Sequence, residues 1–159
     1  MSEDAHEAAN TPGVIAPPPL IYGGALAIGL LAKALSPAGF LPRPIARALG
    51  WPLTGGGLLL GLLSYRALRS AETNVSPYEP TTALVTEGPY RFTRNPLYLS
   101  LTLAYGGIAA LANAPWAALL LPFVLLVMRR GVIHREERYL EREFGEEYLR
   151  YKARVRRWI

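Results

Sequence analysis

The chain has 159 residues, of which 51% are hydrophobic, with a formal net charge of +5 and no cysteine. This length predicts one domain, and the lack of cysteine excludes a disulfide, a thiolate metal site and a cysteine nucleophile. The charges are unevenly spread, because segments 8–32, 48–65 and 97–128 carry no charged side chain. A bilayer core needs roughly 20 apolar residues per crossing. The sequence therefore predicts an all-α integral membrane protein.

Residues 1–19 are predicted to form a flexible N-terminal tail. They contain three acidic residues, no lysine or arginine, and the run Pro17-Pro18-Pro19. A secretory signal peptide begins with positive charge, so this segment does not resemble one.

Residues 20–159 are predicted to be a single membrane domain with about four crossings. The run 97–128 is too long for one crossing, because its 32 residues at about 1.5 Å each would span roughly 48 Å against a core of about 30 Å. We expect Asn113-Ala114-Pro115 to break it into a helical hairpin. The predicted crossings are 20–35, 51–68, 97–112 and 116–133, and the linker 38–50 is expected along the membrane interface.

The basic residues predict the topology. Of the 17 lysines and arginines, four lie between the second and third apolar runs and ten follow Met128. The positive-inside rule places the central loop and the C-terminus in the cytoplasm, and four crossings place the N-terminus there too. The first run is short and carries Lys33 near its end, so the lysine must snorkel. If this run is only interfacial, the side of the tail changes.

Two glycines of the second run, Gly57 and Gly61, form a small-xxx-small pair. Such pairs let helices approach closely in lipid, but simple tolerance of glycine in membrane helices is an equally good interpretation.

Residues 134–151 are predicted to form an amphipathic cytosolic helix that Gly145 interrupts. Leu140, Phe144, Tyr148 and Tyr151 recur at helical spacing and give it one apolar face. The basic tail after this helix is typical of a contact with anionic lipids. Nucleic-acid binding is the competing interpretation of the basic charge, and we do not expect it for a membrane chain.

Residues 82–98 contain the breaker pairs Gly88-Pro89 and Asn95-Pro96 between two long apolar runs. In a membrane protein, irregular backbone is tolerated where it is buried in protein or lines a cavity. This segment is therefore predicted to be an irregular ligand-binding loop, with an ordinary surface loop as the alternative.

The polar residues near this loop limit the chemistry. There are only two histidines, without metal-ligand spacing, so no metal site is expected. Arginines, tyrosines and the pair Glu136-Glu137 together suit a zwitterionic ligand with a carboxylate, an amino group and an aromatic ring. The alternatives are interfacial snorkelling for Arg129 and Arg130 and a solvated helix face for the two glutamates.

The segment Gly88-Pro-Tyr-Arg-Phe-Thr-Arg-Asn-Pro-Leu-Tyr98, followed by Glu136-Glu137 and Phe144-Gly-Glu-Glu-Tyr148 with Tyr151, resembles the isoprenylcysteine carboxyl methyltransferase and phospholipid methyltransferase family of integral membrane enzymes. The resemblance covers roughly residues 81–158. It implies a prokaryotic-type enzyme of the cytoplasmic membrane that binds S-adenosyl-L-methionine in elements 82–98 and 129–151 on the cytoplasmic side. It also implies a lipophilic methyl acceptor that arrives from the bilayer.

The resemblance assigns roles to particular residues. Glu137 and the arginines Arg94 and Arg130 would be catalytic, and the arginines match residues able to orient an acceptor carboxylate. The cofactor would contact Leu84, Val85, Gly88, Tyr90, Arg94, Asn95, Pro96, Tyr98, Glu136 and Glu137.

One departure concerns the acceptor. The eukaryotic carboxyl methyltransferases have histidine where this chain has Asn95, and an asparagine is no base at neutral pH. A carboxylate or thiolate acceptor needs only alignment, whereas an amine must lose a proton to Glu137 or to water. The competing functions are a membrane reductase that uses NADPH and a non-catalytic lipid-binding protein.

Overall fold

The computed structural model describes residues 11–74, 76 and 78–158, and these residues form helices and loops without a strand. Among these residues the bundle consists of four long helices, because α5, η2 and α6 are continuous. The elements are α2 (Pro18–Leu35), α3 (Arg43–Ser70), the 3-10 helix η1 (Gly88–Arg91), α4 (Pro96–Leu111), α5 (Pro115–Val127), the π-helical turn η2 (Met128–Ile133) and α6 (His134–Arg154).

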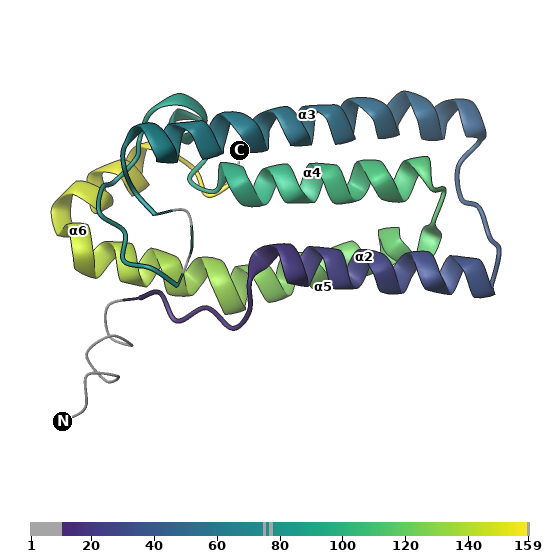
Figure 1. Ribbon diagram of the computed structural model, residues 1–159, viewed down its shortest axis with the longest axis horizontal. Coiled ribbons are helices and arrows are strands. Elements are labelled where there is room, and N and C mark those ends of the chain that lie inside the picture. Colours follow the sequence, from purple (N-terminus) through teal and green to yellow (C-terminus); the bar gives the residue numbers. More distant parts are fainter. Residues whose placement is uncertain (1–10, 75, 77, 159) are drawn as a thin grey trace.

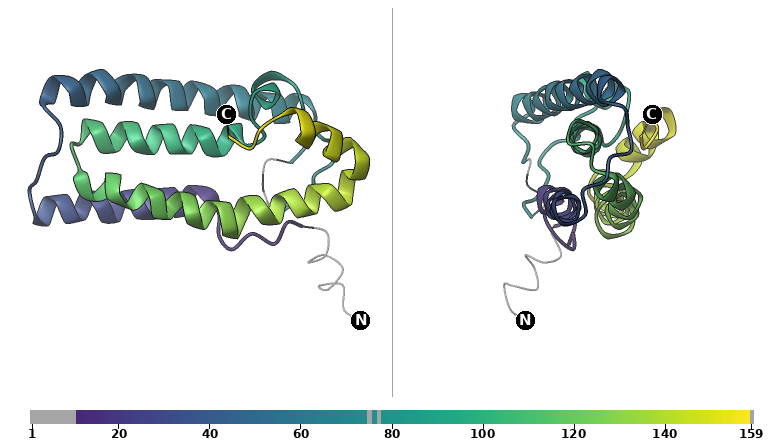
Figure 2. Two further views of the ribbon diagram at one scale, coloured as in Figure 1. Left: turned by 180° about the vertical axis from the view of Figure 1, so that it is seen from behind. Right: turned by 90° about the vertical axis from the view of Figure 1, so that its right-hand side faces the viewer.

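The long helices run up and down along one axis (Figure 1). Helix α3 packs along α4 and α2 packs along α5, as the end-on view of Figure 2 shows. The α2–α3 and α4–α5 connections lie at one end of the bundle, whereas η1, α6 and residues 155–158 lie toward the other. Loop 82–98 and the C-terminal elements are therefore at the same end, as predicted.

Within the part of the chain that the structure describes, two helices are long and apolar enough to cross a membrane: α2 and the continuous helix Pro115–Arg154. Large apolar side chains, including Ile28, Leu59 and Phe123, point outward from the bundle, and such surfaces are typical of an interaction with lipid or protein. The expectation of four crossings is supported only for these two. Helix α4 has only 16 residues, which is short for a crossing. In α3, five glycines lower the mean hydropathy of residues 48–65.

The prediction of an interfacial linker at 38–50 is wrong for its second half. Helix α3 begins at Arg43, with Pro44 in its first turn, where proline is well tolerated. Ala46 and Gly50 are buried, and a Cβ on Gly50 would lie 2.4 Å from Leu111 Cγ of α4. These small residues continue the α3–α4 contact beyond Trp51.

The α3–α4 interface decides between the two interpretations of the glycines. A Cβ on Gly57 would lie 2.8 Å from both Ser100 O and Ala104 N of α4, and one on Gly61 would lie 3.0 Å from Ser100 Oγ. The backbones therefore approach so closely that only glycine fits at Gly57.

Residues 11–17 pack against the C-terminal half of the chain, although the sequence analysis assigned them to the tail. Val14 belongs to the hydrophobic core with Met128 and Val132. Ile15 N donates to Gly131 O at 3.3 Å, and Arg135 Nη1 donates to the carbonyl of Gly13 at 2.7 Å. Residues 1–10 of the predicted tail lie outside the described residues.

Two details of the helices agree with their sequence. Lys33 donates to the carbonyl of Ala112 at the end of α4, where helix carbonyls attract a cation. Gly145 has φ of 48° and ψ of −124°, so it interrupts α6 as predicted.

Candidate functional site

The loop before α4 is held against α6 by side-chain hydrogen bonds. Thr73 Oγ1 accepts from Thr82 N at 3.1 Å, Thr81 N donates to Tyr139 Oη at 3.0 Å, and Tyr151 Oη donates to Tyr90 O at 2.8 Å. Gly88 adopts φ of 57°, a left-handed conformation that glycine accommodates readily. Irregular backbone is thereby fixed beside a charged helix.

A cavity of about 140 Å³ lies between this loop, the start of α4 and α6. Nine of the predicted site residues line it: Leu84, Val85, Tyr90, Arg94, Asn95, Pro96, Tyr98, Glu136 and Glu137. Gly88 does not line the cavity but shapes the turn before Tyr90. Arg130 is exposed and also lies outside the lining, so the structure does not bring this predicted catalytic residue to the site.

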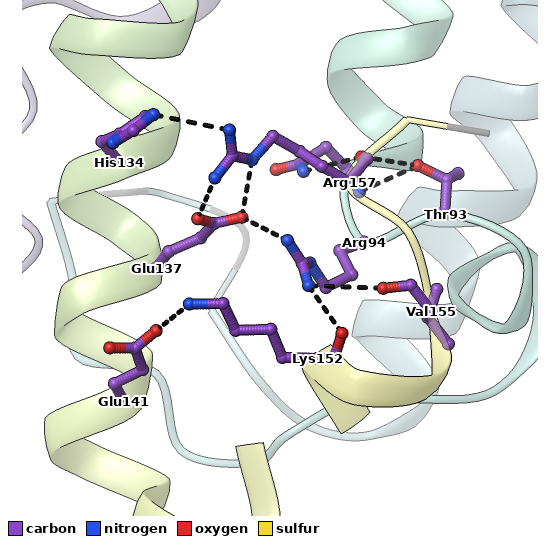
Figure 3. Close-up of polar contacts among 9 residues, drawn as sticks. Thr93, Arg94, His134, Glu137, Glu141, Lys152, Val155 and Arg157 are labelled. Atoms are coloured by element: carbon purple, nitrogen blue, oxygen red, sulfur yellow. Dashed lines mark hydrogen bonds and ion pairs between the residues drawn. The ribbon is translucent and has the colours of Figure 1, made fainter. Parts of the chain in front are cut away.

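The Glu137 carboxylate lies between two guanidinium groups (Figure 3). Arg94 Nη2 donates to Oε1 at 2.8 Å. Arg157 donates to both oxygens, from Nε to Oε1 at 2.9 Å and from Nη2 to Oε2 at 2.6 Å. Glu137 is buried, so it is not on a solvated face, and its carboxylate is fully engaged by protein groups.

The C-terminal segment, residues 155–158, is pinned to the beginning of α4 through its backbone (Figure 3). Arg94 N donates to Arg156 O at 3.0 Å. Arg157 O accepts from Thr93 Oγ1 and from Asn95 Nδ2, both at 3.0 Å. The Asn95 amide therefore holds the C-terminal segment at the beginning of α4.

The two adjacent glutamates differ in their ionisation. Burial raises the pKa of Glu136 to about 7, and Tyr98 Oη donates a hydrogen bond to its carboxylate. Burial also raises the pKa of Glu137, but the hydrogen bonds and charges of Arg157 and Arg94 outweigh it and leave this pKa lowered. Near neutral pH, Glu137 is ionised, whereas Glu136 is partly protonated.

Two buried polar atoms of cavity-lining residues have no hydrogen-bond partner within the described residues: Tyr148 Oη and Arg94 Nε. Burial raises the pKa of Tyr148, so its phenol stays protonated and can donate. Buried donors are nearly always paired in folded proteins. Two such donors beside one cavity indicate a ligand that carries an acceptor group.

The sequence analysis missed two parts of the site. Tyr139, Tyr148 and Tyr151 line the cavity, whereas Tyr148 and Tyr151 were interpreted only as parts of an apolar helix face and of the motif, and Tyr139 was not singled out. The basic tail was assigned to lipid, but Arg157 binds Glu137 and Lys152 binds Glu141. Correct assignment would have required the fold, because 20 residues separate Arg157 from its partner.

The geometry defines a helical protein with apolar outer faces and, at one end, a cavity lined by both polar and apolar side chains. The phospholipid methyltransferase family matches residues 45–147, so the chain belongs to this family of methyltransferases, and the resemblance noted in the sequence is confirmed. The family and the two apolar helices suggest a membrane protein.

A protein of Haemophilus influenzae described only as uncharacterized is 43% identical over 63 residues, which are 40% of this chain and all of that protein. No solved structure matches the chain significantly.

Proposed function

We propose that the protein transfers a methyl group from S-adenosyl-L-methionine to a lipophilic acceptor in the cytoplasmic membrane, with the cavity facing the cytoplasm. The observation that carries this proposal is the pair of buried donors without partners, Tyr148 Oη and Arg94 Nε, at the cavity of a methyltransferase-family chain. The basic residues after Met128 favour the cytoplasmic orientation.

The residues present fit the cofactor group by group. The two donors suit its carboxylate, and the Glu136 carboxylate suits its amino group or ribose hydroxyls. The rings of Tyr90, Tyr98 and Tyr151 line the same cavity and offer π-faces to a sulfonium. When bound, the cofactor supplies an electrophilic methyl group.

Glu137 receives a different role from the one the resemblance implied. Its carboxylate is occupied by two arginines, so we infer that it positions Arg94 instead of binding the cofactor's amino group. Arg94 in turn presents Nε to the ligand.

The cavity must widen for the whole cofactor to enter, because ligand sites for molecules of this size are typically about 300 Å³ or larger. The wall at residues 81–85 is irregular backbone, and its N–H groups donate hydrogen bonds to Thr73 Oγ1 and Tyr139 Oη. Irregular segments of this kind open at lower free energy than packed helices, so this wall is the part expected to move.

The rate enhancement is expected to come from alignment of the acceptor with the methyl group in a site shielded from water. A carboxylate or thiolate attacks without losing a proton. An amine acceptor would also have to lose a proton, which requires a base. Glu136, with a pKa of about 7, is better suited to accept it than Glu137.

Calorimetric titration with S-adenosylhomocysteine, with NADPH as the control ligand, tests the proposal on the detergent-purified protein. We expect saturable binding of S-adenosylhomocysteine alone. Binding of NADPH alone would favour the reductase, and binding of neither would favour a non-catalytic lipid-binding protein.

A variant pair tests which donor serves the ligand. Tyr148→Phe should weaken S-adenosylhomocysteine binding by about tenfold or more, as expected for a lost hydrogen bond to a charged group. Tyr65→Phe is the matched control, because Tyr65 is exposed on α3 and does not line the cavity. Equal affinities of the two variants would remove Tyr148 from the site.

A further inference from the structure

A second hollow lies on the outside of the bundle between α4 and α5, with a volume of about 570 Å³. We call it the α4–α5 groove. None of its residues also lines the cavity described above, so it is a separate feature. Its wall consists of Leu99 and Thr102 of α4, Pro122, Leu125 and Leu126 of α5, Arg129 of η2, and Trp158.

The groove has a polar end and an apolar body. Arg129 is the charged residue in its wall. It is exposed, and its side chain forms no hydrogen bond or ion pair in the described part of the chain. The apolar part begins at Leu126 and Leu125 and continues to Pro122, seven residues earlier in the helix. At about 1.5 Å per residue this distance is roughly 10 Å.

The position of the polar end matches the headgroup level of a bilayer. Arg129 follows the charge-free run that ends at Met128, and Trp158 lines the same groove. Tryptophan and arginine both favour the membrane interface. The guanidinium suits a phosphate, which it can bind through two parallel hydrogen bonds, and no acidic side chain lines the groove to compete.

We propose that the α4–α5 groove binds an anionic glycerophospholipid, with the phosphate on Arg129 and an acyl chain against Leu99, Leu125 and Leu126. This inference depends on insertion in a bilayer and is independent of methyl transfer. The bound lipid also contacts Trp158, the neighbour of the residue that holds Glu137. Lipid occupancy therefore stabilises the C-terminal segment against the bundle.

A comparison of two arginine variants tests the contact between Arg129 and the lipid headgroup. The purified protein in neutral detergent is titrated with phosphatidylglycerol or phosphatidylcholine of identical acyl chains, and bound lipid is counted by native mass spectrometry. We expect preference for phosphatidylglycerol, and a loss of about tenfold or more in Arg129→Gln, as for a hydrogen bond between charged groups. The control Arg130→Gln removes the same charge one residue away from an exposed side chain outside the groove.

The control should change affinity by less than about fivefold, the diffuse contribution of one surface arginine. Equal losses in the two variants, or equal binding of the two lipids by the unmodified protein, would overturn the proposal.

A second pair of variants tests the acyl-chain contact. Leu126→Trp adds bulk in the groove at an exposed position and should reduce bound phosphatidylglycerol. The control Leu119→Trp adds the same bulk to an exposed residue of α5 outside the groove and should leave binding unchanged. Undiminished binding in Leu126→Trp would show that the lipid does not occupy the groove.

Discussion

Replacement of Arg157 by alanine should release the C-terminal segment while the bundle stays folded. The change removes two hydrogen bonds to the Glu137 carboxylate, at 2.9 and 2.6 Å. A hydrogen bond between charged groups contributes about 1.5–3 kcal/mol when well shielded. The Arg157 side chain is 24% exposed and Glu137 keeps its bond to Arg94, so we expect a loss of only about 1–3 kcal/mol for the pair.

Hydrogen exchange at the amide of Arg94 measures this loss of stability of the docked C-terminal segment. The N–H of Arg94 donates to Arg156 O across the docked segment, and each 1.4 kcal/mol corresponds to a tenfold change in the opening equilibrium. Hydrogen exchange at Arg94 should therefore accelerate by about 5- to 150-fold in Arg157→Ala. The amide of Leu99, which donates to Asn95 O within α4, provides an internal reference.

Arg156→Ala is the matched control, because it removes an exposed side chain from the same segment but keeps the carbonyl that accepts from Arg94. We expect its exchange at Arg94 to stay within about threefold of the unmodified protein, since exposed substitutions usually change stability by about 0.5 kcal/mol or less. If the two variants exchange alike, the Arg157–Glu137 pair does not hold the segment.

Three further predictions concern stability. Gly57→Ala should destabilise the protein by about 1–3 kcal/mol, as overpacking does, because the added Cβ would lie 2.8 Å from backbone atoms of α4. The control Gly55→Ala has nothing within 4 Å of its added Cβ and should be neutral or slightly stabilising. Equal shifts of the unfolding temperature in the two variants would contradict the close approach of α3 and α4. Because the pKa of Glu136 is raised, the folded state holds this proton more tightly than the unfolded state, and stability should fall as pH rises from about 4.5 to about 7. The unfolding temperature of Glu136→Gln should not show this fall with pH. If the variant shows the same fall, other groups cause the pH dependence. Tyr151→Phe should cost about 1–3 kcal/mol because it leaves Tyr90 O without its donor, whereas Tyr148→Phe has no protein hydrogen bond to lose and should unfold at nearly the same temperature as the unmodified protein.

The features that depend on local pattern were predicted well from the sequence. Proline and glycine pairs located the loop before α4, and the charge-free runs located the helices α2, α4 and α5. The start of α3 was missed because Arg43 and Arg47 indicate a polar linker, while the burial of Ala46 and Gly50 against α4 becomes visible only when the two helices are paired.

The candidate site shows the same division. Resemblance to a motif identified most residues of the site, but it did not predict which residues they contact. The Arg157–Glu137 contact depends on the chain turning back after α6, and the pKa difference between Glu136 and Glu137 depends on which of them meets the arginines. Adjacent identical residues are indistinguishable until the direction of each side chain is known.

The π-helical turn η2 sets the rotational phase of everything that follows it. A π-turn accommodates one residue more than the α-helical repeat, and one residue of an α-helix corresponds to about 100° of rotation. If the same residues formed an uninterrupted α-helix from Pro115, the glutamates and tyrosines of α6 would be turned away from loop 81–91 by about that angle. The orientation of the site therefore depends on a part of the chain that contributes no side chain to the cavity.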